Sequence, residues 1–169
     1  MGVRIALVVL NVFAALWAWV GLRLTGAAPV LTLAPFAISL AVVAYGWRGA
    51  RVAPAARRSH VGRVVGLWST IEVIALLIAA NVLEHAHRPD LMLPVGAIIV
   101  GLHFFPLARG IPVRLYHATG AGLLAVGASG LLLPASDRPL VSGMGAALVL
   151  WGTALIIILR SPQRAPTAA

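Results

Sequence analysis

The chain has 169 residues, of which 61% are hydrophobic and only 10% are charged. A soluble domain carries about 25% charged residues, so this composition excludes an ordinary soluble protein. The sequence contains no lysine, so the net charge of +9 comes from arginine, and a Schiff-base lysine is excluded. It also contains no cysteine, which excludes disulfides and thiolate metal sites.

Six apolar stretches follow one another along the chain. Each is close to the roughly 20 residues that cross about 30 Å of hydrocarbon. They are residues 5–24, 30–47, 63–83, 91–108, 115–134 and 140–159. The linkers between them are short, so the sequence predicts an all-α integral membrane protein with a single transmembrane domain, 1–169, folded as a six-transmembrane-helix bundle.

The first stretch carries a stripe of small residues at helical spacing. These are Asn11, Ala14, Ala15, Ala18 and Gly21. Because lipid gives helices no hydrophobic reason to associate, small residues predict close helix packing, within the chain or in a homo-oligomer. Residues 5–24 could instead be a cleaved signal, but an apolar run of this length favours a retained span.

The arginines are distributed unevenly over the linkers. If the N-terminus is cytoplasmic, the inside segments hold ten of them: Arg4, Arg48, Arg51, Arg57, Arg58, Arg63, Arg109, Arg114, Arg160 and Arg164. The outside segments hold three: Arg23, Arg88 and Arg138. This bias predicts a multi-pass protein of the cytoplasmic (inner) membrane with both termini cytoplasmic. It also explains the net charge without a nucleic-acid partner.

The linker at 48–63 contains five of these arginines: Arg48, Arg51, Arg57, Arg58 and Arg63. They could bind anionic lipid headgroups, each contributing about 1 kcal/mol near the membrane surface. The alternative is that they only fix the topology.

The third stretch carries the most informative polar residues. Glu72 lies near its middle, with Trp68, Ala75 and Ala79 on the same helix face. An ionised carboxylate there costs at least about 3 kcal/mol, so we expect Glu72 to face the interior and to be protonated or paired. Asn81 lies half a turn round the helix. Polar residues on opposite faces predict that this helix is central in the bundle.

Glu84, His85, His87 and Asp90 cluster at the outer end of the third stretch. Zn²⁺ accepts two histidines together with a carboxylate, so these four residues form a weak candidate metal site. The alternative is an ordinary polar loop.

Two histidines lie on the inner side of the next two stretches. His103 is about 8 Å from the inner end of the fourth, and His117 is slightly shallower in the fifth. Glu72, His103 and His117 would form a descending series suited to proton relay. A depth gap of about 7 Å between Glu72 and His103 predicts an intervening water or a helix tilt. The alternative is that these side chains make structural hydrogen bonds.

The stretch GLHFFPLARGIPVRLYHATGAG, residues 101–122, resembles small uncharacterised bacterial polytopic membrane proteins that carry a GLHFxPLA…YxxTG-like pattern. The matching residues are Gly101, Leu102, His103, Phe104, Pro106, Leu107, Ala108, Tyr116, Thr119 and Gly120. The function of these proteins is unassigned, so the resemblance implies a membrane protein and no particular chemistry.

Three functions remain open from the sequence. The first is binding or proton-coupled movement of a small solute, with Glu72, His103, His117 and Asn81 as the binding residues. The second is an intramembrane metal-dependent hydrolase or transferase that uses the outer cluster. The third is a structural or accessory subunit without chemistry of its own. We expect no cofactor, and no residue is assigned as catalytic.

Overall fold

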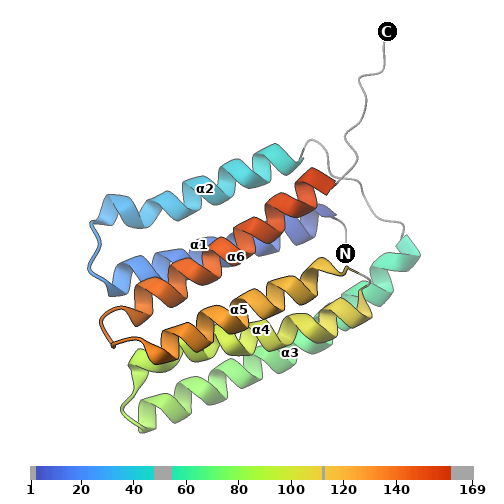
Figure 1. Cartoon of the computed structure of the whole chain (residues 1–169). Helices are drawn as coiled ribbons and strands as arrows, with labels where there is room; N and C mark the ends of the chain where they lie inside the picture. The colour runs from blue at the N-terminus through green and yellow to red at the C-terminus, as the bar shows by residue number, and fades with distance from the viewer. Residues whose placement is uncertain (1–2, 48–54, 112, 161–169) are drawn as a thin grey trace.

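The structure is a computed structural model that describes residues 3–47, 55–111 and 113–160 (Figure 1). It contains six long helices and one short 3₁₀ helix, η1 (Pro89–Leu91). The long helices are α1 (Val3–Leu24), α2 (Pro29–Trp47), α3 (Ala55–His85), α4 (Met92–Gly110), α5 (Leu115–Leu132) and α6 (Arg138–Arg160). No strand occurs in these residues.

All six long helices contain a segment that is long and apolar enough to cross a membrane. The chain is therefore a multi-pass membrane protein, and the six predicted spans are confirmed. The main difference is at α3, which begins at Ala55 rather than near residue 63. Alanine and arginine are strong helix formers, so the helix continues through the arginine-rich segment before its apolar part.

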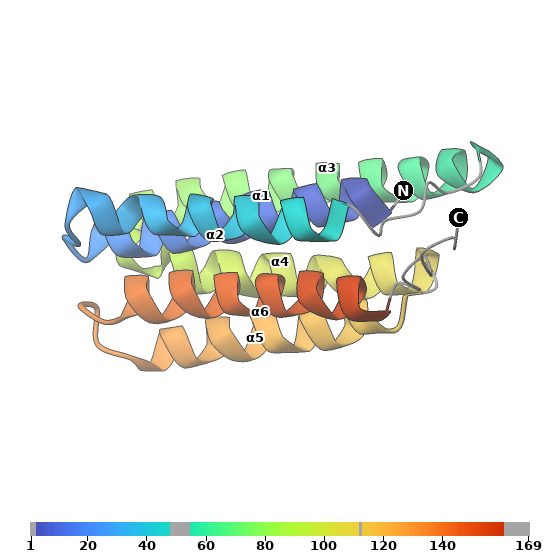
Figure 2. The same cartoon turned by 90° about the horizontal axis from the view of Figure 1, so that it is seen from above.

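The six helices lie side by side with their axes roughly parallel (Figures 1 and 2). Helix α1 packs against α6 and α2, while α4 packs against α5 and α3, and α5 joins the two groups through α6. The core lies between α1, α4, α5 and α6, where Ala14, Leu123 and Ala146 have no exposed surface. The core thus holds four of the helices together and leaves α2 and α3 at its edges.

The small-residue stripe of α1 packs inside the bundle, as predicted. All five of its residues are buried. At one end of the stripe, a Cβ atom added to Gly143 of α6 would lie 2.7 Å from the Cα atom of Gly21. The backbones of α1 and α6 therefore touch, which only glycine permits. This stripe is used within the chain; self-association through other small-residue faces stays a prediction.

A chain of buried polar groups ties α1, α2 and α6 together. The Ser39 hydroxyl donates a hydrogen bond of 2.8 Å to the carbonyl of Asn11 and accepts one of 2.9 Å from Trp151 Nε1. In hydrocarbon such bonds have no competition from water, so they help to fix the position of α2.

The prediction that the third span is central was wrong. Helix α3 packs mainly against α4 and η1, and none of its most apolar 18-residue window is buried. Asn81, on which that prediction rested, is exposed and donates a hydrogen bond of 2.9 Å to the carbonyl of Leu77 in its own helix. Because the amide is satisfied locally, it requires no neighbouring helix.

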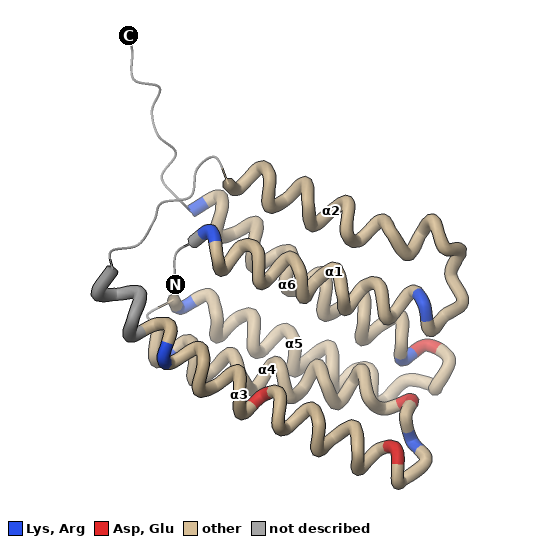
Figure 3. The backbone as a smooth tube through the Cα atoms, turned by 180° about the vertical axis from the view of Figure 1, so that it is seen from behind, with Lys and Arg blue, Asp and Glu red and all other residues tan. Residues whose placement is uncertain are grey.

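Charged residues gather at the two ends of the bundle (Figure 3). We call one end the arginine-rich end: α1, α3 and α5 begin there, and its described arginines are Arg4, Arg63, Arg109, Arg114 and Arg160. The opposite, mixed-charge end holds Arg23, Arg88, Arg138, Glu84, Asp90 and Asp137. The described acidic residue that lies at neither end is Glu72, 13 residues before the end of α3.

Candidate functional site

Glu72 of α3 and His103 of α4 form a direct pair. The Nδ1 atom of His103 lies 3.5 Å from Oε2 of Glu72, and the two side chains are 8% and 13% exposed. No water is needed to join them, so the predicted 7 Å gap overestimated their separation. Side chains lean towards the N-terminus of their helix, and α3 and α4 are antiparallel. The two side chains therefore lean towards each other and close the difference in depth.

The imidazole is oriented by the backbone of α3. His103 Nδ1 lies 3.1 Å from the carbonyl oxygen of Trp68, one turn before Glu72. A carbonyl only accepts, so this contact places the hydrogen on Nδ1 and leaves Nε2 as the acceptor of the neutral ring. Since 3.5 Å is long for a hydrogen bond, the shorter contact with Trp68 carries the main bond. The carboxylate remains in close electrostatic contact.

Two cavities meet at this pair. The larger, about 670 Å³, is formed by α3 and α4 alone and is called the lateral groove here. It is lined by Trp68 and Ala75 beside Glu72, and by Pro106 and Arg109 beside His103. This lining confirms that Trp68, Glu72 and Ala75 share a face. Ala79, predicted on the same face, is not among the residues that line the groove.

The smaller cavity, about 170 Å³, lies further inside the bundle. It is lined by Val9 and Phe13 of α1, Ser69 of α3 and Tyr116 of α5, together with the Glu72–His103 pair. The pair therefore separates a groove at the edge of the bundle from a cavity beneath α1.

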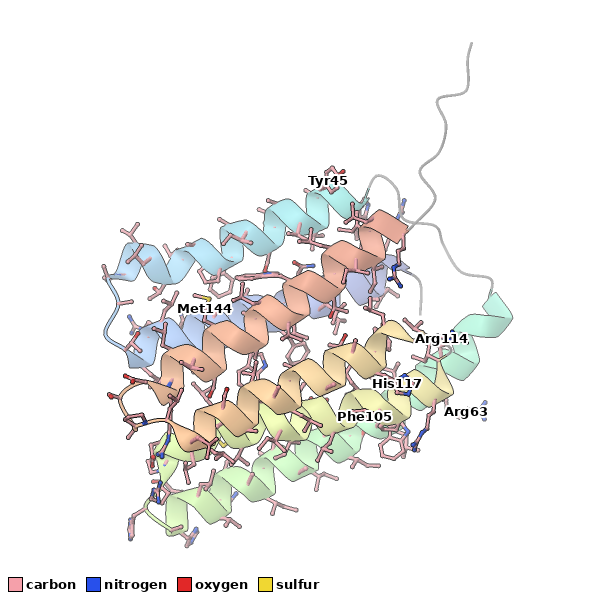
Figure 4. All side chains as sticks on the ribbon, in the orientation of Figure 1. Tyr45, Arg63, Phe105, Arg114, His117 and Met144 are labelled. Atoms are coloured by element: carbon pink, nitrogen blue, oxygen red, sulfur yellow. The ribbon has the colours of Figure 1, made fainter. Side chains whose placement is uncertain are left out.

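His117 does not extend the pair into a series. It is exposed, and its ring packs edge-on against Phe105 with the ring centroids 6.0 Å apart (Figure 4). Within the described residues, the side chain of His117 makes no hydrogen bond or ion pair. The structure thus brings together two of the three predicted relay residues. Helix α5 turns His117 outwards because its inward positions, Thr119 and Gly120, pack against neighbouring helices.

Asn81 also lies away from the pair. Its side chain bonds to its own helix, and its carbonyl contacts Nδ1 of His85 at 2.8 Å. Both contacts belong to the last turns of α3 at the mixed-charge end. Asn81 is therefore part of the helix ending, and the structure does not bring it to Glu72.

The outer cluster does not gather as a set of metal ligands. In the part of the chain that the structure describes, no three histidine, aspartate or glutamate residues come together in that way. Asp90 instead pairs with Arg88 at 3.2 Å and with Arg138 at the start of α6. His87 forms the turn that ends α3, and Glu84 is exposed. The weak metal interpretation overlooked Arg138, which competes for the carboxylate from 48 positions along the chain.

The pair has limited but definite chemistry. A carboxylate and an imidazole in contact can hold and release protons, and both border spaces large enough for a small molecule. Sequence reasoning missed Arg109 as a lining residue, because six helical steps turn it about 240° from His103 and the spacing gives no sign of a shared face. The chain matches no protein-family model, no curated protein and no solved structure.

Proposed function

We propose that the chain binds a small solute and couples its binding or movement to protonation of Glu72, with His103 as the proton-exchanging partner. The observation that carries the proposal is the 3.5 Å contact between the two side chains at the junction of two cavities. A carboxylate within the hydrocarbon costs about 3 kcal/mol or more when ionised, so such residues are rare outside functional pathways.

The cellular setting belongs to the same proposal. The arginine bias supports a cytoplasmic arginine-rich end in a bacterial inner membrane, which agrees with the resemblance of residues 101–122. Anionic lipid headgroups are the proposed partners of the 48–63 arginines. Of these, Arg63 is exposed at the start of the apolar part of α3, while the side chains of Arg48, Arg51, Arg57 and Arg58 lie outside the described residues.

The two other functions have less support. A metal-dependent enzyme needs a ligand set, and the described part of the chain holds no group of three suitable residues. An accessory role would use His103 only to fasten α4 to the Trp68 carbonyl of α3. This role predicts that the pair matters for stability and not for proton exchange, so the two can be separated by experiment.

The test combines infrared spectroscopy with two substitutions of His103. In wild-type protein in lipid, a pH change should produce a carboxyl C=O band that Glu72→Gln removes and Glu84→Gln leaves in place. His103→Asn places an amide N–H near the position of Nδ1, so it should preserve the bond to Trp68 while removing the titratable ring. We expect this variant to keep its thermal stability and to shift or slow the Glu72 band.

His103→Ala removes both functions of the ring and completes the comparison. If His103→Asn leaves the Glu72 band unchanged and His103→Ala lowers only stability, the histidine is structural and the proposal fails. Absence of any carboxyl band that depends on Glu72 would also contradict it.

A further inference from the structure

The lateral groove opens sideways, between α3 and α4. It runs from Arg109 and Gly110 at the arginine-rich end to Ile99 near the middle of the bundle. The eleven helical steps from Ile99 to Gly110 span about 16 Å, half of the roughly 30 Å hydrocarbon thickness. Its rims, Ile71 and Leu102, are 45% and 55% exposed. In a membrane these rims face lipid, so a molecule dissolved in one leaflet reaches the groove without crossing water.

The groove has a mainly apolar wall that carries one acidic group, Glu72, with His103 beside it and Arg109 at the arginine-rich end. The other described acidic residues all lie at the mixed-charge end, so Glu72 is the single described carboxylate that a molecule in the groove can meet. Trp68 lies one turn before it on the same wall. An indole and a carboxylate within one turn favour a large, weakly hydrated cation, by cation–π and charge attraction together.

Arg109 lines the arginine-rich end of the groove, beyond His103 from Glu72. It is exposed in the last turn of α4, six residues and about 9 Å along the helix from His103. Its charge, with the other arginines at this end, repels a cation that approaches from that aqueous side. A cation that enters from the bilayer between Ile71 and Leu102 reaches Glu72 without first passing Arg109.

Glu72 also has room for a second partner. Its Oε2 atom faces His103, and within the described residues Oε1 accepts no hydrogen bond. When the carboxyl group is protonated, a bound cation replaces the proton: the O–H bond breaks, the proton leaves to water, and the cation pairs with the carboxylate. The charge of the site is unchanged by this exchange.

We infer that the lateral groove binds a lipophilic organic cation, taken from the bilayer between α3 and α4, in exchange for the proton of Glu72. This inference rests on the proposed function and names its substrate class. The groove volume of about 670 Å³ lies within the range of about 300–1,000 Å³ of small-molecule sites.

The test uses tetraphenylphosphonium and its negatively charged analogue of the same shape, tetraphenylborate. Binding is measured with the full chain in nanodiscs by calorimetry, in two buffers of different ionisation enthalpy to count protons. We expect saturable phosphonium binding with about one proton released at acidic pH. Glu72→Gln should weaken binding at least tenfold, while Glu84→Gln should leave it unchanged. Trp68→Leu should weaken it about tenfold and Trp68→Phe less, because phenylalanine keeps an aromatic face.

Several outcomes would overturn the inference. One is equally tight binding of tetraphenylborate, which would show that the groove binds bulky apolar ions of either charge. A second is phosphonium binding that Glu72→Gln does not alter, and a third is no phosphonium binding. If the infrared band of Glu72 still responds to pH in these cases, the proposed function survives and only the substrate class is wrong. If that band is absent, both fail.

Discussion

At the scale of single residues, His87 occupies a position that usually belongs to glycine. Its φ of 53° is left-handed, and the amide of Arg88 donates to the carbonyl of Leu83 at 2.8 Å. Gly26 ends α1 in the same way with a φ of 72°. Both are helix-ending motifs in which glycine avoids a steric cost of about 1 kcal/mol. His87 has that steric cost. Its backbone ends α3, and this conformation explains its place in the loop with no need for metal binding.

We predict that His87→Gly raises the free energy of unfolding by about 1 kcal/mol, because glycine adopts a left-handed conformation without strain. The measurement is unfolding in mixed micelles, followed by circular dichroism. The reciprocal control is Gly26→His, which should lower stability by a similar amount, since an added Cβ there would meet nothing within 4 Å and the cost is conformational only. A loss of stability in His87→Gly would show that the imidazole makes a stabilising contact.

At the scale of helices, close backbone contact distinguishes the inner pairs from the edges. A Cβ atom on Gly120 of α5 would lie 2.7 Å from the carbonyl oxygen of Gly101 in α4, so this pair touches as closely as α1 and α6 do. By contrast, a Cβ atom on Gly66 of α3 would meet nothing within 4 Å. The loosely packed α3 is the helix that carries Glu72, so a change in its tilt would alter the lateral groove without disturbing the core.

We predict that Gly143→Ala lowers the free energy of unfolding by about 1–3 kcal/mol, because the methyl group would lie 2.7 Å from the Trp17 carbonyl oxygen and force α1 and α6 apart. Unfolding in mixed micelles provides the measurement. Gly152→Ala, on the same helix, is the matched control: nothing lies within 4 Å of its added Cβ, and alanine favours a helix by about 1 kcal/mol. Equal stability of the two variants would argue against the observed α1–α6 contact.

At the scale of the whole molecule, the two ends of the bundle differ in charge. An even number of spans places the start of α1 and the end of α6 at the same, arginine-rich end. The three described acidic residues of the mixed-charge end offset its three arginines, whereas the arginine-rich end has no described acidic residue. This asymmetry gives the bundle one orientation that the positive-inside rule favours.

We predict that a reporter fused to the C-terminus is active in the cytoplasm. Because the native chain has no cysteine, Ala135→Cys in the exposed turn between α5 and α6 provides the matching position at the other end. An impermeant maleimide should label it in intact spheroplasts without permeabilisation. Labelling that requires permeabilisation, or a reporter active only outside, would reverse the orientation.

The sequence by itself determined the spans and much of the local geometry. The need to cross about 30 Å of hydrocarbon with every backbone group bonded forces long apolar helices, so the apolar stretches along the sequence located all six. The buried stripe of α1 also followed from spacing, because residues such as Ala14 and Ala18 recur at helical intervals. Glu72 and His103 stood out as polar residues in apolar runs.

Only the tertiary structure decided which helices are neighbours and which side chains meet. Lipid is as apolar as a protein core, so hydropathy cannot distinguish the exposed α3 from the buried α6. The depth of a residue in the membrane follows from its position along its own helix. Contact between two residues also depends on where their helices lie in the bundle and on how side chains lean on antiparallel helices. For that reason the contact between Glu72 and His103, the outward turn of His117 and the pairing of Asp90 with Arg138 became visible only in the folded bundle.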